Sequence, residues 1–174
     1  MMQLVVFAVA SAGTIRVSWA SLRDLRSHGF YRFFAFESIL ALILLNVEHW
    51  FSDPFSLRQI ASWLMLLASL FLVGHGVYLL REIGKPSGPI ENTTALVRIG
   101  AYRYIRHPLY GSLLWLAWGA FLKNLSLPGI ALALIATTAL IASARTEEAE
   151  NLRKFGDEYG AYMKTTRMFI PCVW

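Results

Sequence analysis

The sequence is poor in cysteine and in charge. Its one cysteine, Cys172, excludes an internal disulfide framework and a thiolate metal cluster. Only 16% of the 174 residues are charged, whereas 56% are hydrophobic and the mean hydropathy is +0.50. A soluble domain of this size is rarely so apolar. We therefore expect an integral membrane protein whose first partner is the lipid bilayer.

Several common functional motifs are also missing. The sequence has no G-x-S-x-G nucleophile elbow and no phosphate-binding P-loop. His107 has no second histidine at short helical spacing, so no metal site is expected. The net charge of +5 is not gathered into a basic stripe with interleaved aromatic residues, so no nucleic-acid partner is expected. No internal repeat is visible, which disfavours a small transporter.

Five apolar runs are present, and they predict five transmembrane helices in an all-α fold, an integral membrane helical bundle. Because the last two runs are joined by a short turn, they should form an antiparallel hairpin. Good helix formers follow the last run, so its helix should leave the membrane and end near Gly156. The runs cover residues 2–20, 33–51, 57–80, 108–122 and 129–144.

The chain is predicted to be one domain, residues 1–174, with three N-terminal spans within 1–83. A glycine- and proline-rich connection at 84–107 precedes the hairpin at 108–144, and a polar extension follows at 145–174. With five spans, thirteen of the sixteen lysines and arginines fall on one side of the membrane. The positive-inside rule then predicts an outside N-terminus and a cytoplasmic C-terminus.

Two glutamates of the second run and a histidine of the third are candidates for a polar role inside the membrane. Glu37 and Glu48 are separated by eleven positions, which at about 100° per residue returns them to nearly the same helix face. They either contact a polar substrate or a cavity arginine, or they form a structural pair satisfied by Arg16 or interfacial water. His75, between two glycines, could hydrogen-bond across a close helix contact. Structural roles are favoured for these residues.

Residues 97–110 concentrate arginine, tyrosine and histidine directly before the fourth run. Unpaired arginines are costly in hydrocarbon, so this segment must lie at the membrane surface or line a polar cavity. Pro108 suits the first turn of a helix, which places His107 at its mouth. The hairpin should bring this segment beside residues 145–150, so that both build one cytoplasmic pocket. Arg106 is expected to face headgroups or the adjacent loop.

This inventory of aromatic rings, arginines and carboxylates suits a small zwitterion with a cationic group. S-adenosylmethionine is one candidate among several. Arg145 and Glu148 are three residues apart and share a helix face, whereas Glu147 is rotated from Arg145 by about 200°.

Two blocks of sequence carry a family resemblance. Residues 96–110, LVRIGAYRYIRHPLY, match the pattern L-V-x-x-G-x-Y-x-x-x-R-H-P-x-Y. Glu147 and Glu148, followed by residues 155–162, FGDEYGAY, match E-E and then F-G-x-E-Y-x-x-Y. In these blocks the chain resembles the isoprenylcysteine carboxyl methyltransferases and their bacterial and archaeal relatives, and it is also similar to phospholipid methyltransferases. The resemblance extends over residues 94–171.

The resemblance implies that the C-terminal half binds S-adenosylmethionine at the cytosolic face and releases S-adenosylhomocysteine, with the substrate entering from the membrane. In the family an arginine before the glutamate pair is associated with the reacting group of the substrate. Arg145 is the candidate here, although the spacing of the eukaryotic enzymes would place it at Ser143. The implied cofactor-binding residues are Leu96, Val97, Tyr102, His107, Pro108, Leu109, Tyr110 and Glu147.

The expected function is methyl transfer from S-adenosylmethionine to a membrane-partitioned small molecule or lipidated substrate. Carboxylate O-methylation is favoured, with Arg145 orienting the carboxylate. A thiol or amine acceptor stays possible, and Glu148 would then serve as the base. The alternative is a non-catalytic membrane accessory or sensor protein that retains the methyltransferase fold.

Overall fold

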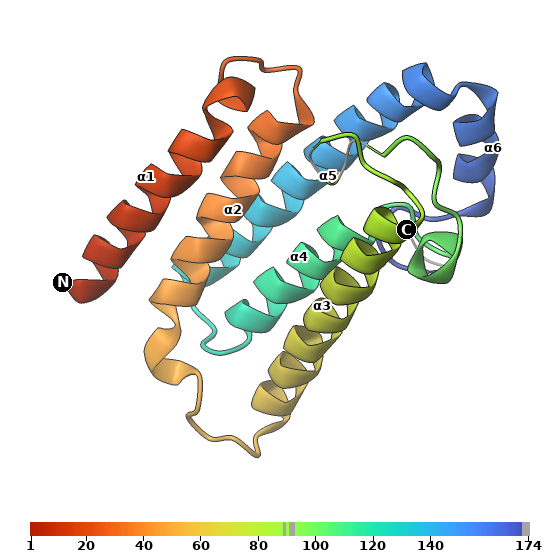
Figure 1. The fold of residues 1–174 in the computed structure, drawn as a ribbon. Helices are drawn as coiled ribbons and strands as arrows, with labels where there is room; N and C mark the ends of the chain where they lie inside the picture. The colour runs from red at the N-terminus through yellow and green to blue at the C-terminus, as the bar shows by residue number, and fades with distance from the viewer. Residues whose placement is uncertain (89, 91–92, 172–174) are drawn as a thin grey trace.

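The computed structural model describes residues 1–88, 90 and 93–171, which form a helical bundle (Figure 1). Among these residues two isolated β-bridges occur and no strand. The predicted all-α class is therefore confirmed. In chain order the elements are α1 (Met2–Leu22), α2 (His28–Leu45), the short 3-10 helix η1 (Val47–His49), α3 (Leu57–Glu82), the 3-10 helix η2 (Gly100–Arg103), α4 (Pro108–Phe121), α5 (Leu127–Phe155) and α6 (Asp157–Thr165).

Four helices, α1, α2, α3 and α5, are long and apolar enough to cross a membrane. The predicted fourth span forms α4, which has 14 residues and is about 21 Å long at 1.5 Å per residue. A bilayer core is about 30 Å thick, so α4 is shorter than a usual spanning helix. It packs against α2, α3 and α5, and so lies inside the bundle.

The helix ends follow from local sequence. Serine side chains cap three helices: Ser27 accepts a hydrogen bond from a backbone N–H of α2, Ser56 from one of α3 and Ser126 from one of α5. Pro108 is the first residue of α4, as predicted. The helix that contains the last apolar run continues to Phe155 and ends at Gly156, whose φ is +56°. The predicted helical extension is therefore confirmed.

The packing of the helices leaves a space between α2 and α3. α2 runs along α5, and α3 runs along α4, whereas α2 and α3 make little direct contact (Figure 1). The α4–α5 contact is close because Ala117, Ala120, Ala133 and Ala136 are fully buried there. Side chains of α2 and α3 can therefore face each other across a cavity floored by α4.

α1 packs mainly on α2, through polar contacts. The hydroxyls of Ser11 and Thr14 donate to the carboxylate of Glu37, and Gln3 Nε2 donates to Glu48 Oε1 at 3.3 Å. Both carboxylates thus face α1, and their partners are α1 side chains instead of the predicted Arg16. The structural reading of this pair holds, since neither glutamate lines the cavity described below.

Gly100 sets the position of η2 against α3. Its φ is +57°, and a Cβ there would contact His75 Nε2 and would lie 2.7 Å from Leu79 Cδ1. His75 itself is half-buried and stacks on the Phe71 ring at 5.7 Å. His75 therefore has a structural role as the surface on which η2 rests.

We expect Gly100→Ala to lower the free energy of unfolding by roughly 2–4 kcal/mol, because it combines a left-handed backbone with overpacking. Thermal unfolding in detergent measures the loss. Gly88→Ala is the matched control in the same connection, since its Cβ would contact no atom within 4 Å. Adding His75→Ala should recover part of the loss, and equal losses for both glycine variants would contradict the steric explanation.

Candidate active site

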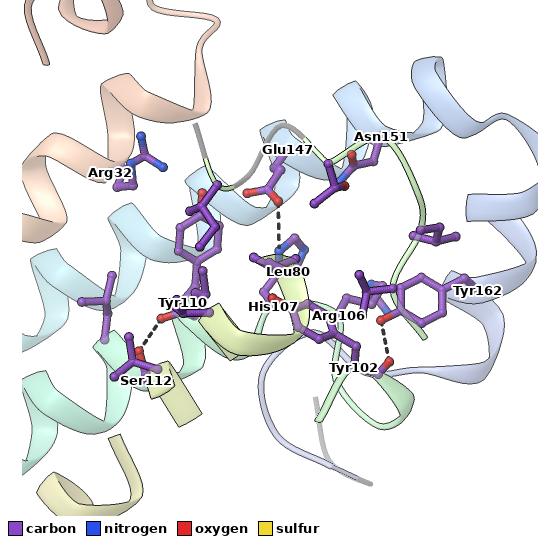
Figure 2. A pocket seen from close by; sticks show the side chains of 18 of the residues that line it. Arg32, Leu80, Tyr102, Arg106, His107, Tyr110, Ser112, Glu147, Asn151 and Tyr162 are labelled. Carbon is purple, nitrogen blue, oxygen red and sulfur yellow. Dashed lines mark hydrogen bonds and ion pairs between the residues drawn. The ribbon is translucent and has the colours of Figure 1, made fainter. Parts of the chain in front are cut away.

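The main cavity has a volume of about 340 Å³ and lies where the connection before α4 meets α5 and α6 (Figure 2). The structure thus brings together the two segments that the sequence placed in one pocket. The wall consists of Arg32 and Phe36 from α2, Val73, Val77 and Leu80 from α3, Ile90, Thr93, Leu96, Val97, Tyr102, Arg106 and His107 from the connection, Leu109, Tyr110, Ser112 and Leu113 from α4, Glu147, Asn151 and Phe155 from α5, and Tyr159 and Tyr162 from α6.

Seven of the eight predicted cofactor-binding residues lie on this wall. The eighth, Pro108, is fully buried at the start of α4 and lies behind the wall. The seven are Leu96, Val97, Tyr102, His107, Leu109, Tyr110 and Glu147.

His107, Arg106 and Glu148 form a buried polar network beside the cavity. Arg106 Nε donates to Glu148 Oε1 at 2.6 Å, and His107 Nε2 lies 3.3 Å from the same oxygen. The Arg106 guanidinium also donates to the backbone oxygens of Thr166 at 2.6 Å and Met163 at 3.3 Å. The Arg106 and Glu148 side chains are each 10% exposed. The network therefore ties the C-terminal segment to α5 and to the start of α4.

Arg106 was expected to face headgroups or the adjacent loop. Its charge is instead paired inside the protein with Glu148, and it also donates to backbone oxygens of the C-terminal segment. Glu148 was expected to serve as a base for a thiol or amine acceptor, and a base must contact the acceptor. The structure does not place Glu148 on the cavity wall. The Glu148 side chain lies behind the wall, where Arg106 and His107 occupy its carboxylate. In this geometry Glu148 orients His107, whose other ring nitrogen lies 4.0 Å from Glu147 Oε1 (Figure 2).

Arg145 does not line the cavity. It is exposed on α5, because about 100° per residue turns it by 200° from Glu147, and the cavity-facing residues Glu147 and Asn151 are one turn apart. Ser143, where the spacing of the eukaryotic enzymes would place the arginine, does not line the cavity either. It is fully buried, and its hydroxyl donates to the backbone oxygen of His28 at 3.2 Å. Neither predicted catalytic residue thus reaches the cavity wall.

The N-terminal half was expected to help shape the substrate tunnel, but sequence reasoning did not identify which of its residues line the cavity. Arg32 and Phe36 are four residues apart and project from one face of α2 into the cavity. Val73 and Val77 do the same from α3. The spacing of Arg32 and Phe36 was visible in the sequence, but no motif identified them. Their position could not be predicted without knowing that α2 packs along α5.

Neutral phenols surround the polar end of the cavity. Burial is the main cause that raises the pKa of Tyr102, and the nearby carboxylate of Glu147 raises it further. Burial likewise raises the pKa of Tyr159 and of Tyr162. The Tyr162 hydroxyl donates to the backbone oxygen of Tyr102 at 2.6 Å, and Asn151 lies on the same wall as Tyr159. This end offers aromatic faces, hydroxyls, an amide and a carboxylate.

The other end of the cavity is apolar and opens between α2 and α3. Phe36 and Val73 line it and are 37% and 38% exposed, respectively. Because α2 and α3 are both candidate spans, the opening faces the region where lipid would lie.

Known proteins with similar sequences are methyltransferases. The chain is 24% identical over 149 residues to the methanethiol S-methyltransferase of Pseudomonas deceptionensis, which covers 74% of this chain and 55% of that protein. It is 26% identical over 117 residues to methanethiol S-methyltransferase 1 of Bradyrhizobium diazoefficiens, covering 64% of this chain and 39% of that protein.

A methanethiol S-methyltransferase of Crocosphaera subtropica is 26% identical over 113 residues, covering 64% of this chain and 44% of that protein. The chain thus spans about half the length, or less, of these relatives. The phospholipid methyltransferase family matches residues 57–158, which include α3, the connection, the hairpin and most of the cavity wall. Since this match covers more than half of the chain, the protein belongs to the phospholipid methyltransferase family of membrane methyltransferases.

Proposed function

We propose that this protein transfers a methyl group from S-adenosylmethionine to the sulfur of a small apolar thiol that enters the cavity from the membrane. The observation that carries the proposal is one cavity with two different ends. Its polar end is lined mainly by residues of the matched family region, with Tyr159 and Tyr162 just beyond it, and its apolar end is lined by side chains of two candidate membrane-spanning helices.

The polar end fits the methyl donor chemically. The faces of Tyr102, Tyr159 and Tyr162 suit a sulfonium cation, and the Glu147 carboxylate suits an ammonium group or ribose hydroxyls. When bound, S-adenosylmethionine supplies an electrophilic methyl group. His107 keeps the wall in place, because its ring stacks on Tyr110 at 5.5 Å and is held by Glu148. The protein's contribution is therefore chiefly positioning.

The acceptor is assigned from the apolar end. Its walls of Phe36, Val73, Val77 and Leu113 suit a short aliphatic body. Carboxylate O-methylation would have used Arg145, which lies outside the wall, so the structure removes the reason for favouring it. The relatives named above methylate a thiol, methanethiol. A thiol acceptor therefore takes precedence over a carboxylate or an amine.

We propose that the cofactor end faces the cytoplasm, with the N-terminus outside and with α4 counted as a short fourth span, which brings the total to five. The clustering of lysines and arginines supports this orientation, since thirteen of the sixteen fall on the side of the membrane predicted to be cytoplasmic. Accessibility of single cysteines introduced at Ser87 and Ser52 to an impermeant reagent in intact vesicles tests it.

The proposal is tested by binding and by transfer with the purified protein. S-adenosylhomocysteine should bind saturably in calorimetry, and labelled methyl groups should pass from S-adenosylmethionine to a short alkanethiol faster than to the carboxylic acid of the same length. Absence of saturable binding overturns the proposal. Binding without transfer to any thiol, acid or amine supports the alternative of a non-catalytic accessory protein.

We expect Tyr102→Ala to weaken S-adenosylhomocysteine binding by about 10-fold or more, because it removes a buried aromatic face from the wall. Tyr104→Ala is the matched control in the same segment, because Tyr104 is exposed and does not line the cavity. Calorimetric titration of both variants measures the difference. Equal affinities of the two variants would contradict the assignment of the polar end to the cofactor.

A further inference from the structure

We propose that Arg32 of α2 positions the acceptor by holding its sulfur as a thiolate at the junction of the two cavity ends. This inference rests on the proposed function. Two arginines lie on the described cavity wall, Arg32 and Arg106. Arg106 is engaged by Glu148 and by two backbone oxygens, so its role is to hold the fold. Arg32 is the wall cation nearest in sequence to the apolar opening at Phe36.

The location of Arg32 fits an acceptor with an apolar body and an anionic sulfur. Arg32 lies one helical turn before Phe36, which lines the opening, and both project into the cavity. Figure 2 shows the Arg32 guanidinium on the α2 side of the cavity, across from the α5 residues Glu147 and Asn151. Arg32 also interacts with the protein itself, but a guanidinium has five N–H donors and can bind a ligand as well.

A positive charge beside the sulfur favours this reaction. The thiolate is the nucleophilic form of a thiol, and a neighbouring arginine lowers the pKa of the thiol. The acceptor releases its proton to water on binding at Arg32. Its sulfur then forms a bond to the donor methyl carbon while the bond from that carbon to the sulfonium sulfur breaks, and the bonding electron pair stays on that sulfur. The products are a neutral thioether and S-adenosylhomocysteine.

The other titratable groups of the described wall do not supply this function. Besides Arg106 they are Glu147 from α5, His107 from the connection, and the phenols of Tyr102, Tyr110, Tyr159 and Tyr162. Glu147 carries the charge opposite to that required, and His107 is held by Glu148. One turn before Arg32, His28 Nδ1 pairs with Glu150 Oε2 at 2.7 Å, away from the wall. Arg32 is thus the described wall residue whose charge suits an anion.

The test compares Arg32→Gln, Arg32→Lys and the control Arg26→Gln, which removes the same charge from the exposed α1–α2 loop. Removing a charge that lowers a thiol pKa by about 2 units should lower kcat/KM for a short alkanethiol roughly 100-fold near neutral pH. The loss should shrink as pH rises toward the pKa of the free alkanethiol, because the acceptor then ionises in water without the help of Arg32. Arg32→Lys should recover part of the activity.

Binding of S-adenosylhomocysteine separates this inference from the proposed function. If wild type and Arg32→Gln bind it within about 2-fold of each other and the pH profile shifts upward, the assignment stands. A wild type that binds no S-adenosylhomocysteine removes the proposed function itself. A wild type that binds and transfers, with an Arg32→Gln loss equal at every pH, overturns the thiolate assignment. Faster transfer to the matched carboxylic acid, with no pH shift, also overturns it.

Discussion

Glu148→Ala is expected to lower the free energy of unfolding by about 3–5 kcal/mol, because it leaves the buried Arg106 guanidinium without its counter-ion. Both side chains of this pair are 10% exposed, and the Arg106 Nε to Glu148 Oε1 distance is 2.6 Å. The same substitution removes the acceptor that orients His107. Thermal or denaturant unfolding in a fixed detergent measures the loss.

The matched control is Glu158→Ala, which breaks a pair of the same chemistry at the surface. Arg98 Nη2 lies 2.8 Å from Glu158 Oε1, but these side chains are 41% and 62% exposed. Solvent screens such a pair, so its removal should change stability by about 1 kcal/mol or less. Similar losses for the two glutamates would show that the Arg106–Glu148 pair is not buried as described. Glu148→Gln, which keeps a hydrogen-bond acceptor, should fall between them.

Val73→Trp should lower kcat/KM for the acceptor by at least about 100-fold, because a large ring in the opening between α2 and α3 displaces the acceptor from its reacting position. Val73 lines the cavity and is 38% exposed. The affinity for S-adenosylhomocysteine should stay within about 2-fold, since the polar end is unchanged. Steady-state kinetics with a short alkanethiol, together with calorimetry, measures both quantities.

Leu70→Trp is the control for that variant. Leu70 lies on the same helix, one turn earlier, but it is 67% exposed and does not line the cavity. It should keep the wild-type kcat/KM. Equal losses in the two variants would point to a general effect of tryptophan on α3, and an unchanged Val73→Trp enzyme would show that the acceptor uses another route.

Much of the C-terminal half could be predicted from the sequence, because its features are local. Pro108 begins α4 since its ring suits the first helical turn, and Gly156 ends α5 since it adopts a positive φ. The short link between α4 and α5 makes them antiparallel and brings residues 97–110 next to 145–155. For this reason seven of the eight predicted cofactor-binding residues lie on one cavity wall.

The predictions that differ from the structure concern the direction in which a side chain points. Arg106 and Arg145 were both plausible as surface or cavity residues, and helix periodicity alone could not decide which face of α5 would meet the cavity. The packing of α2 along α5 decides it: Glu147 and Asn151 face the cavity, Glu148 is buried against Arg106, and Arg145 is exposed.

The sequence by itself determined the apolar character of the chain, its helices and the two blocks that identify a methyltransferase, because hydropathy, caps and motifs act over a few residues. Only the tertiary structure decided the cavity itself, since it needs side chains from α2 and α3 that are distant in sequence and carry no motif. The small residues between α4 and α5 let that hairpin close tightly, while α2 and α3 stay apart across it. Because α2 borders this cavity, Arg32 lies on its wall.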